Sequence, residues 1–134
     1  MLLLTHILFS VFLGVMLFKA DILFFSIMLI ASIIPDLDIH IPFFKHRGFF
    51  HSIFAGALIS LIFIFQSFSL SLAFLAGFCS HLLADSLTVA GTCPFWPSQY
   101  RTKFGFIRTG KLSEQIFFVV LMACILIRVL YILN

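Results

Sequence analysis

Histidine and aspartate side chains in three short motifs are the groups in this sequence best suited to chemistry. The motifs are Pro35-Asp36-Leu37-Asp38, His46-Arg47-Gly48-Phe49-Phe50-His51 and Ser80-His81-Leu82-Leu83-Ala84-Asp85. Imidazole and carboxylate groups suit Zn, Mn or Fe, whereas a structural zinc site would favour thiolates. Together with one histidine near the start of the chain, the motifs offer seven donors: His6, Asp36, Asp38, His46, His51, His81 and Asp85.

Each motif taken alone also has a plainer interpretation. On a helix, His81 and Asp85 are four residues apart and face the same way, so they can share an ion or form a polar pair between helices. Asp36 and Asp38 would share a face if the backbone were extended, but aspartates are also common in turns. The segment His46–His51 would suit a loop that touches lipid headgroups. A metal site therefore requires that the motifs meet in space.

The composition identifies the elements that must bring them together as membrane helices. Of 134 residues, 63% are hydrophobic and 10% are charged, with a mean hydropathy of +1.24. Soluble domains carry about 25% charged residues, so a water-soluble globule is excluded. A net charge of +3 without a basic stripe excludes a nucleic-acid interface. Three cysteines without a C-x-x-C motif predict no disulfide framework.

The apolar runs predict an all-α, polytopic bundle of about five transmembrane helices in a single domain, residues 1–134. A span needs about 20 apolar residues, or about 17 at the short end. The uncharged run 48–84 is too long for one crossing, and Gln66-Ser67-Phe68-Ser69 predicts a tight turn within it. Ser113 is a candidate N-cap of the last helix. The expected spans are 2–18, 20–34, 50–66, 70–88 and 113–133, of which the second could be re-entrant.

The basic residues predict the orientation of this bundle. Six of the eight lie in the loops 35–49 and 89–112, and only Lys19 and Arg128 lie on the other side. The positive-inside rule then places the N-terminus and both loops in the cytoplasm, as in a multi-pass protein of the cell inner membrane. In this topology the seven donors meet at the cytoplasmic helix ends. Ionisable groups in membrane segments are costly, which indicates a function for them.

The motifs also resemble a known family. Their order is Thr5-His6, Ile34-Pro35-Asp36-Leu37-Asp38, His46-Arg47-Gly48-Phe49-Phe50-His51-Ser52, Ser80-His81-Leu82-Leu83-Ala84-Asp85 and Pro94-Phe95-Trp96-Pro97. Over about residues 1–105 this is similar to the YdjM-type family of bacterial and archaeal inner-membrane proteins, described as membrane-bound metal-dependent hydrolases. A fainter likeness is to the ligand order of zinc-dependent phospholipases C. It implies two ions at most, bridged by Asp85, with the core ligands His6, Asp36, His51, His81 and Asp85.

We therefore expect a membrane-embedded, metal-dependent hydrolase that cleaves a phosphoester of a lipid or lipid-linked substrate with metal-activated water. The cofactor would be one or two Zn ions, with Mn or Fe as alternatives. Asp38 would act as a base, Arg47 would neutralise developing charge, and His46 would stand beside them. Candidate substrate contacts are Arg101, Trp96 and Lys45. The expected partners are membrane lipids and no nucleic acid, and a second copy of the chain is possible although no motif specifies it.

Two other functions use the same residues. A metal-ion or proton transporter, or a regulatory membrane protein, would place its ionisable groups near the bilayer midplane. Here they are expected at one interface, which favours the enzyme. A catalytically inactive scaffold with a structural metal is the third possibility. The loop 91–101 similarly fits either an interfacial anchor or a lid over the site.

Overall fold

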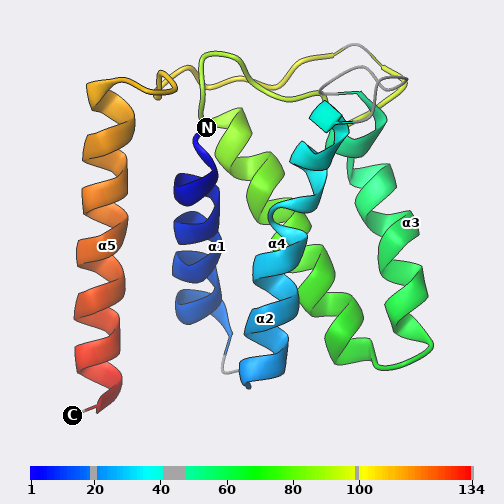
Figure 1. The fold of residues 1–134 in the computed structure, drawn as a ribbon, viewed down its shortest axis with the longest axis horizontal. Coiled ribbons are helices and arrows are strands. Elements are labelled where there is room, and N and C mark those ends of the chain that lie inside the picture. Colours follow the sequence, from blue (N-terminus) through cyan, green and yellow to red (C-terminus); the bar gives the residue numbers. More distant parts are fainter. Residues whose placement is uncertain (19–20, 41–47, 99, 134) are drawn as a thin grey trace.

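A computed structural model describes residues 1–18, 21–40, 48–98 and 100–133 (Figure 1). The described residues contain no strand, so the prediction of an all-helical fold is confirmed. These residues form five α-helices and two short 3-10 helices. Their bounds are α1 Leu3–Leu17, α2 Ile22–Ala31, η1 Ile34–His40, η2 Phe49–His51, α3 Ile53–Ile64, α4 Phe68–Ser86 and α5 Leu112–Leu133.

Short polar side chains set the starts of three helices. The side chains of Asp21, Ser52 and Ser67 accept hydrogen bonds from backbone N–H groups in the first turns of α2, α3 and α4. The predicted cap of α5 is wrong. That helix begins at Leu112, so Ser113 lies within its first turn, and the Ser113 hydroxyl accepts a hydrogen bond from the Arg108 N–H at 3.0 Å.

The helices differ in whether they are long enough to cross a membrane. By length and composition, α4 and α5 are candidate membrane spans. The helices α1, α2 and α3 have 15, 10 and 12 residues. At about 1.5 Å per residue they are shorter than a hydrocarbon core of about 30 Å. Within the predicted span 20–34, α2 ends at Ala31, and the chain continues through a turn into η1.

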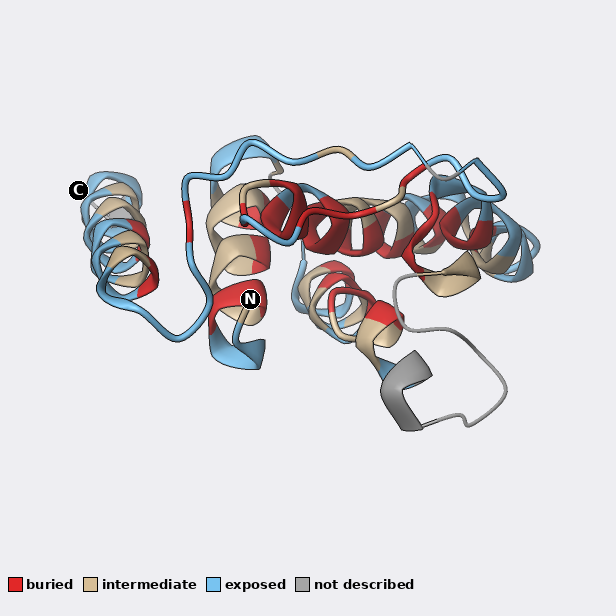
Figure 2. Ribbon diagram, turned by 90° about the horizontal axis from the view of Figure 1, so that it is seen from above, coloured by how far each residue is buried: buried red, intermediate tan, exposed pale blue. Residues whose placement is uncertain are grey.

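Helix α4 lies at the centre of the molecule and packs against α1, α2 and α3 (Figures 1 and 2). Its Phe74 and Phe78 are buried in the main apolar cluster. At Gly77 an added Cβ would lie 2.0 Å from the carbonyl oxygen of Met28, so α2 and α4 are in close contact there. Helix α5 packs against α1 at the periphery, and very few of its residues are buried inside the protein. Its remaining surface is available to lipid.

Five helix ends lie together at one end of the molecule. They are the N-terminal ends of α1, α3 and α5 and the C-terminal ends of α2 and α4 (Figure 1). The segment 87–111, here called the crossing segment, runs over this end from α4 to α5. Backbone hydrogen bonds from Val89 N–H to Ile107 O and from Ile53 N–H to Pro94 O, both 2.9 Å, fasten it. The basic residues of the crossing segment are Arg101, Lys103, Arg108 and Lys111.

Candidate metal centre

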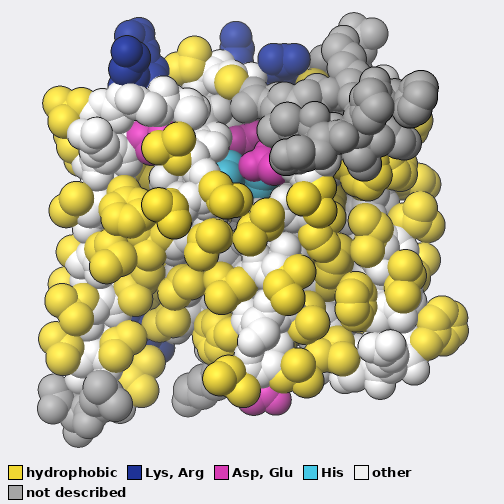
Figure 3. Space-filling model, viewed as in Figure 1, with side chains coloured by type: hydrophobic (Ala, Val, Ile, Leu, Met, Phe, Trp, Pro, Cys, Tyr) yellow, Lys and Arg dark blue, Asp and Glu magenta, His cyan; other side chains and the backbone are white. Residues whose placement is uncertain are grey.

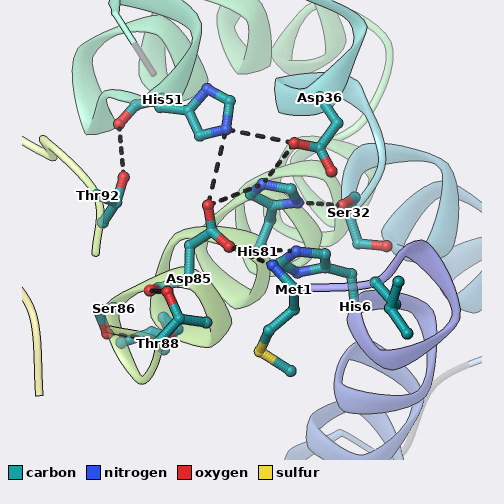
Figure 4. Close-up of polar contacts among 12 residues, drawn as sticks. Met1, His6, Ser32, Asp36, His51, His81, Asp85, Ser86, Thr88 and Thr92 are labelled. Carbon is teal, nitrogen blue, oxygen red and sulfur yellow. Dashed lines mark hydrogen bonds and ion pairs between the residues drawn. The ribbon is translucent and has the colours of Figure 1, made fainter. Parts of the chain in front are cut away.

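Five of the predicted donors come together at this end of the bundle (Figure 4). Helix α1 contributes His6, and α4 contributes His81 and Asp85. The short helices η1 and η2 contribute Asp36 and His51. The three imidazoles and the carboxylate of Asp85 are at most 2% exposed, whereas the side chain of Asp36 is 26% exposed. The cluster is therefore buried, and Asp36 is its most accessible member.

The two oxygens of Asp85 face different groups. Oδ1 lies 3.4 Å from His6 Nε2 and 3.0 Å from the amino group of Met1. Oδ2 lies 3.9 Å from His51 Nε2 and 4.0 Å from His81 Nε2. We refer to these as the Oδ1 side and the Oδ2 side of the cluster. Asp36 belongs to the second, because its Oδ1 lies 3.5 Å from His51 Nε2 and 3.6 Å from His81 Nε2.

A backbone carbonyl fixes the orientation of the central histidine. Nδ1 of His81 lies 2.8 Å from the carbonyl oxygen of Ser32, an acceptor, so Nδ1 carries the proton and donates it. The lone pair of Nε2 then points toward the carboxylates, as in histidines that bind metals. The alternative in which Asp85 orients His81 by a hydrogen bond does not fit, because the 4.0 Å between them is too long. The ring of His81 also stacks on that of His6 at 4.0 Å.

The distances within the cluster fit a shared ion better than direct hydrogen bonds. Two ligands bound tetrahedrally at about 2.0–2.2 Å from one ion lie about 3.4 Å apart. The His–Asp distances of 3.4–3.6 Å are near this value and beyond the usual range of an N–H···O bond. His6 Nε2 and His81 Nε2 are buried and make no hydrogen bond. Such atoms are costly unless something binds them.

Two overlapping groups of three could each hold a metal ion. The first is His6, Asp36 and His81, and the second is His51, His81 and Asp85, with ligand atoms within 4.8 Å of one another in each group. Both groups use His81, whose Nδ1 is engaged by Ser32. His81 therefore has one nitrogen to offer, and one ion can receive it.

Four other predicted residues are placed only in part or not at all. Lys45, His46 and Arg47 lie outside the described residues. Asp38 lies in η1, a 3-10 helix, so the backbone does not take the extended form in which Asp36 and Asp38 would share a face.

Trp96 and Arg101 of the crossing segment have no described contact with the cluster. The ring of Trp96 packs edge-on against Phe49 of η2 at 5.3 Å, two residues before His51. Arg101 is exposed, and its Nη1 donates to the carbonyl oxygen of Ala90 at 3.2 Å. Their roles as substrate contacts stay predictions.

Glu114 is a buried residue near the cluster that the motifs do not include. It is the only glutamate of the chain, and its carboxylate accepts hydrogen bonds from Leu2 N–H and Gly110 N–H, both at 2.7 Å. A glutamate in the first turn of a helix is favoured by the helix dipole, and this is the sequence signal that could have drawn attention to it. Ser32 could not have been identified, because it acts through its backbone carbonyl.

Comparison with known proteins agrees with the family resemblance of the motifs. Neither the curated proteins nor the solved structures compared with the chain include a match. The model of the YdjM inner membrane protein family matches residues 1–134, the whole chain. The helices, the buried cluster and this match lead to one conclusion: the chain belongs to the YdjM inner membrane protein family.

Proposed function

We propose that this protein is a membrane-embedded, metal-dependent hydrolase that cleaves a phosphoester of a lipid or lipid-linked substrate. The observation that carries the proposal is the convergence of three imidazoles and two carboxylates from four elements in one buried cluster. Burial of this many ionisable groups is unfavourable unless they are paired or bind metal. Structural packing alone gives no reason for it.

The donors would suffice for one ion, with room for a second. On the Oδ2 side, His51, His81, Asp36 and Asp85 would form a four-ligand set for Zn, with Mn or Fe as alternatives. On the Oδ1 side, His6 and Asp85 would hold a second ion more loosely, because that ion would compete with the amino group of Met1 for Asp85 Oδ1. Asp85 would contribute one oxygen to each side. Divalent ions held in this way supply a Lewis acid and lower the pKa of a water to about 7.

Residues around the cluster orient its ligands and exclude bulk water from it. The carbonyl of Ser32 fixes the ring of His81, and burial of His6, His51 and His81 keeps bulk water away. The partly exposed Asp36 marks the side from which a substrate would reach the cluster. We assign Asp38 the role of a base and Arg47 that of neutralising charge on the phosphoryl oxygens, with His46 and Lys45 beside them.

The level of the cluster favours a lipid substrate. Figure 3 shows histidine and acidic side chains just below the end that carries basic groups, with hydrophobic side chains covering the helices beneath. A cluster at this boundary would lie at the depth of lipid phosphates. Exposed Trp96 and Arg101 of the crossing segment suit that level, where aromatic and basic residues are enriched. We place this end in the cytoplasm, with all five helices embedded in the inner membrane.

Metal content and turnover test the proposal together. We expect the protein purified in detergent to contain one or two divalent ions per chain and to hydrolyse at least one member of a phospholipid panel. Asp85→Ala and His81→Ala should lose metal and activity. Asp21→Ala is the control, because Asp21 caps α2 at the opposite end and should keep its metal at a stability cost of about 1 kcal/mol. Unchanged metal in both cluster variants would refute the proposal, and retained metal without turnover would indicate a scaffold.

A further inference from the structure

We propose that Glu114 is a positioning residue of the metal centre, which holds the first turn of α1, and with it His6, against Asp85 Oδ1. The inference rests on the proposed function, because it assumes that the cluster binds metal. It adds a residue from α5, a helix that contributes no donor to the cluster.

Glu114 is built into the molecule as a buried, fully bonded carboxylate. It is 2% exposed, although it stands in the first turn of a helix whose neighbouring side chains are largely open. Oε1 accepts a short hydrogen bond from Leu2 N–H and Oε2 accepts one from Gly110 N–H, both at 2.7 Å, and the side chain of Thr5 also hydrogen-bonds to the carboxylate. Hydrogen bonds to a charged acceptor are stronger than neutral ones, so they offset the cost of burial.

The hydrogen bonds that Glu114 accepts from Gly110 and Leu2 connect it to different parts of the molecule. The bond from Gly110 N–H closes the turn before α5, where Gly110 has a positive φ of 71°. Capping of its own helix would require no more than this. The bond from Leu2 joins residues 112 positions apart and fastens α1 to the start of α5. This second bond is the one that bears on the metal centre.

Leu2 transmits the restraint to His6. Leu2 precedes the first residue of α1 and has no side chain that can cap the helix. Its carbonyl oxygen accepts hydrogen bonds from Thr5 N–H at 3.0 Å and His6 N–H at 3.2 Å. The N–H of Leu2 is thus held by Glu114 while its carbonyl holds the backbone of His6. The negative charge of Glu114 also lies near the N-terminus of α1, where the helix dipole favours it.

This path predicts a selective effect. His51, His81 and Asp36 come from η2, α4 and η1, and no step of the path from Glu114 through Leu2 involves them. Loss of the carboxylate should therefore release His6 from Asp85 Oδ1 and weaken the Oδ1 side alone. The Oδ2 side should keep its ion.

The test compares Zn²⁺ binding by the full-length protein with that of Glu114→Gln, Glu114→Ala and Gln115→Ala. Glutamine has the size of glutamate but can accept only one of the two hydrogen bonds. Gln115 is exposed beside Glu114 and serves as the matched control. We expect the wild type and the control to bind two ions per chain, and both Glu114 variants to keep one and bind the second at least tenfold more weakly. Amides of residues 3–6 should also exchange hydrogen faster in metal-free Glu114→Gln.

The outcomes separate this inference from the proposed function. Glu114→Gln with both ions at wild-type affinity and unchanged exchange would overturn the inference and leave the proposed function standing. A wild type that binds a single ion would overturn the inference alone, and a wild type that binds no metal would overturn both. Equal weakening of both ions would also overturn the inference, because it would show a general structural role. If Glu114→Ala does not fold, Glu114→Gln alone decides between these results.

Discussion

Asp85 is the residue on which the whole cluster depends, because its two oxygens face separate sets of nitrogens. His6 stands on the Oδ1 side, and His51 and His81 stand on the Oδ2 side. Removal of a histidine would subtract a ligand from one side only, whereas removal of Asp85 would subtract a ligand from both.

This division predicts the number of bound ions in single variants. His6→Ala should keep one ion per chain, on the Oδ2 side, whereas His51→Ala should bind the Oδ2-side ion more weakly, because three of its four ligands remain. Asp85→Ala should keep none at micromolar free metal. Elemental analysis after gel filtration measures the ratio of metal to protein. Complete loss of metal from both histidine variants would argue for a single shared ion instead.

At the scale of single residues, the sequence indicated the side chains that could bind a metal ion. It did not indicate the groups that hold those side chains in position. The clustered donors are unusual residue types in apolar segments, so residue type alone selected seven candidates, and the resemblance to zinc-dependent phospholipases C implied the five that cluster. Ser32 acts through a carbonyl that every residue has. Glu114 resembles an ordinary helix-start glutamate, and its burial depends on α1, 112 residues earlier in the chain.

At the scale of elements, the contact between α2 and α4 sets the spacing of the cluster. Gly77 lies one turn before His81, and Met28 lies one turn before Ser32. The close contact between Gly77 of α4 and the backbone of Met28 on α2 therefore lies one helical turn from the hydrogen bond that orients His81.

A methyl group at this contact should disturb both stability and metal binding. Gly77→Ala would meet the backbone oxygen of Met28, which cannot move aside, and should cost about 1–3 kcal/mol while weakening metal binding. Gly14→Ala is the comparison, because its Cβ would meet the ring of Phe25, a side chain that can rotate. Thermal unfolding in detergent should rank Gly77→Ala below Gly14→Ala. The opposite ranking would show that the helices can separate without loss.

Helix positions could be predicted from the apolar runs, but two local conformations could not. For the backbone after Pro35 an extended conformation and a turn were both open, and it is a 3-10 helix. Proline restricts the residue before it and leaves the following residues open, so it does not specify the 3-10 helix. The start of α5 at Leu112 similarly depends on hydrogen bonds around Lys111 and Glu114 that no local rule specifies.

At the scale of the whole molecule, the charges differ between the two ends. The crossing segment carries Arg101, Lys103, Arg108 and Lys111 at the end that holds the cluster, and the described residues of the other end include Asp21. Five apolar runs predicted five helices, but the lengths of α1, α2 and α3 could not be read from them, because an apolar run does not mark the residue at which a helix ends.

Cysteine labelling should show which end faces the cytoplasm. In a background with Cys79, Cys93 and Cys124 replaced by serine, Lys103→Cys and Asp21→Cys place one exposed thiol at each end. With an impermeant maleimide outside intact cells, we expect Asp21→Cys to react and Lys103→Cys to react only after lysis. The reverse pattern would place the metal centre on the outer face.

The hydrogen bond between His81 and Ser32 also limits how protons can travel. A peptide carbonyl accepts a hydrogen bond but does not take up the proton, so His81 cannot pass a proton from one ring nitrogen to the other. Any chain of proton transfers that reaches His81 therefore stops there. Within the described cluster, Asp36 is the most exposed member, so we expect protons exchanged with solvent to pass by way of Asp36.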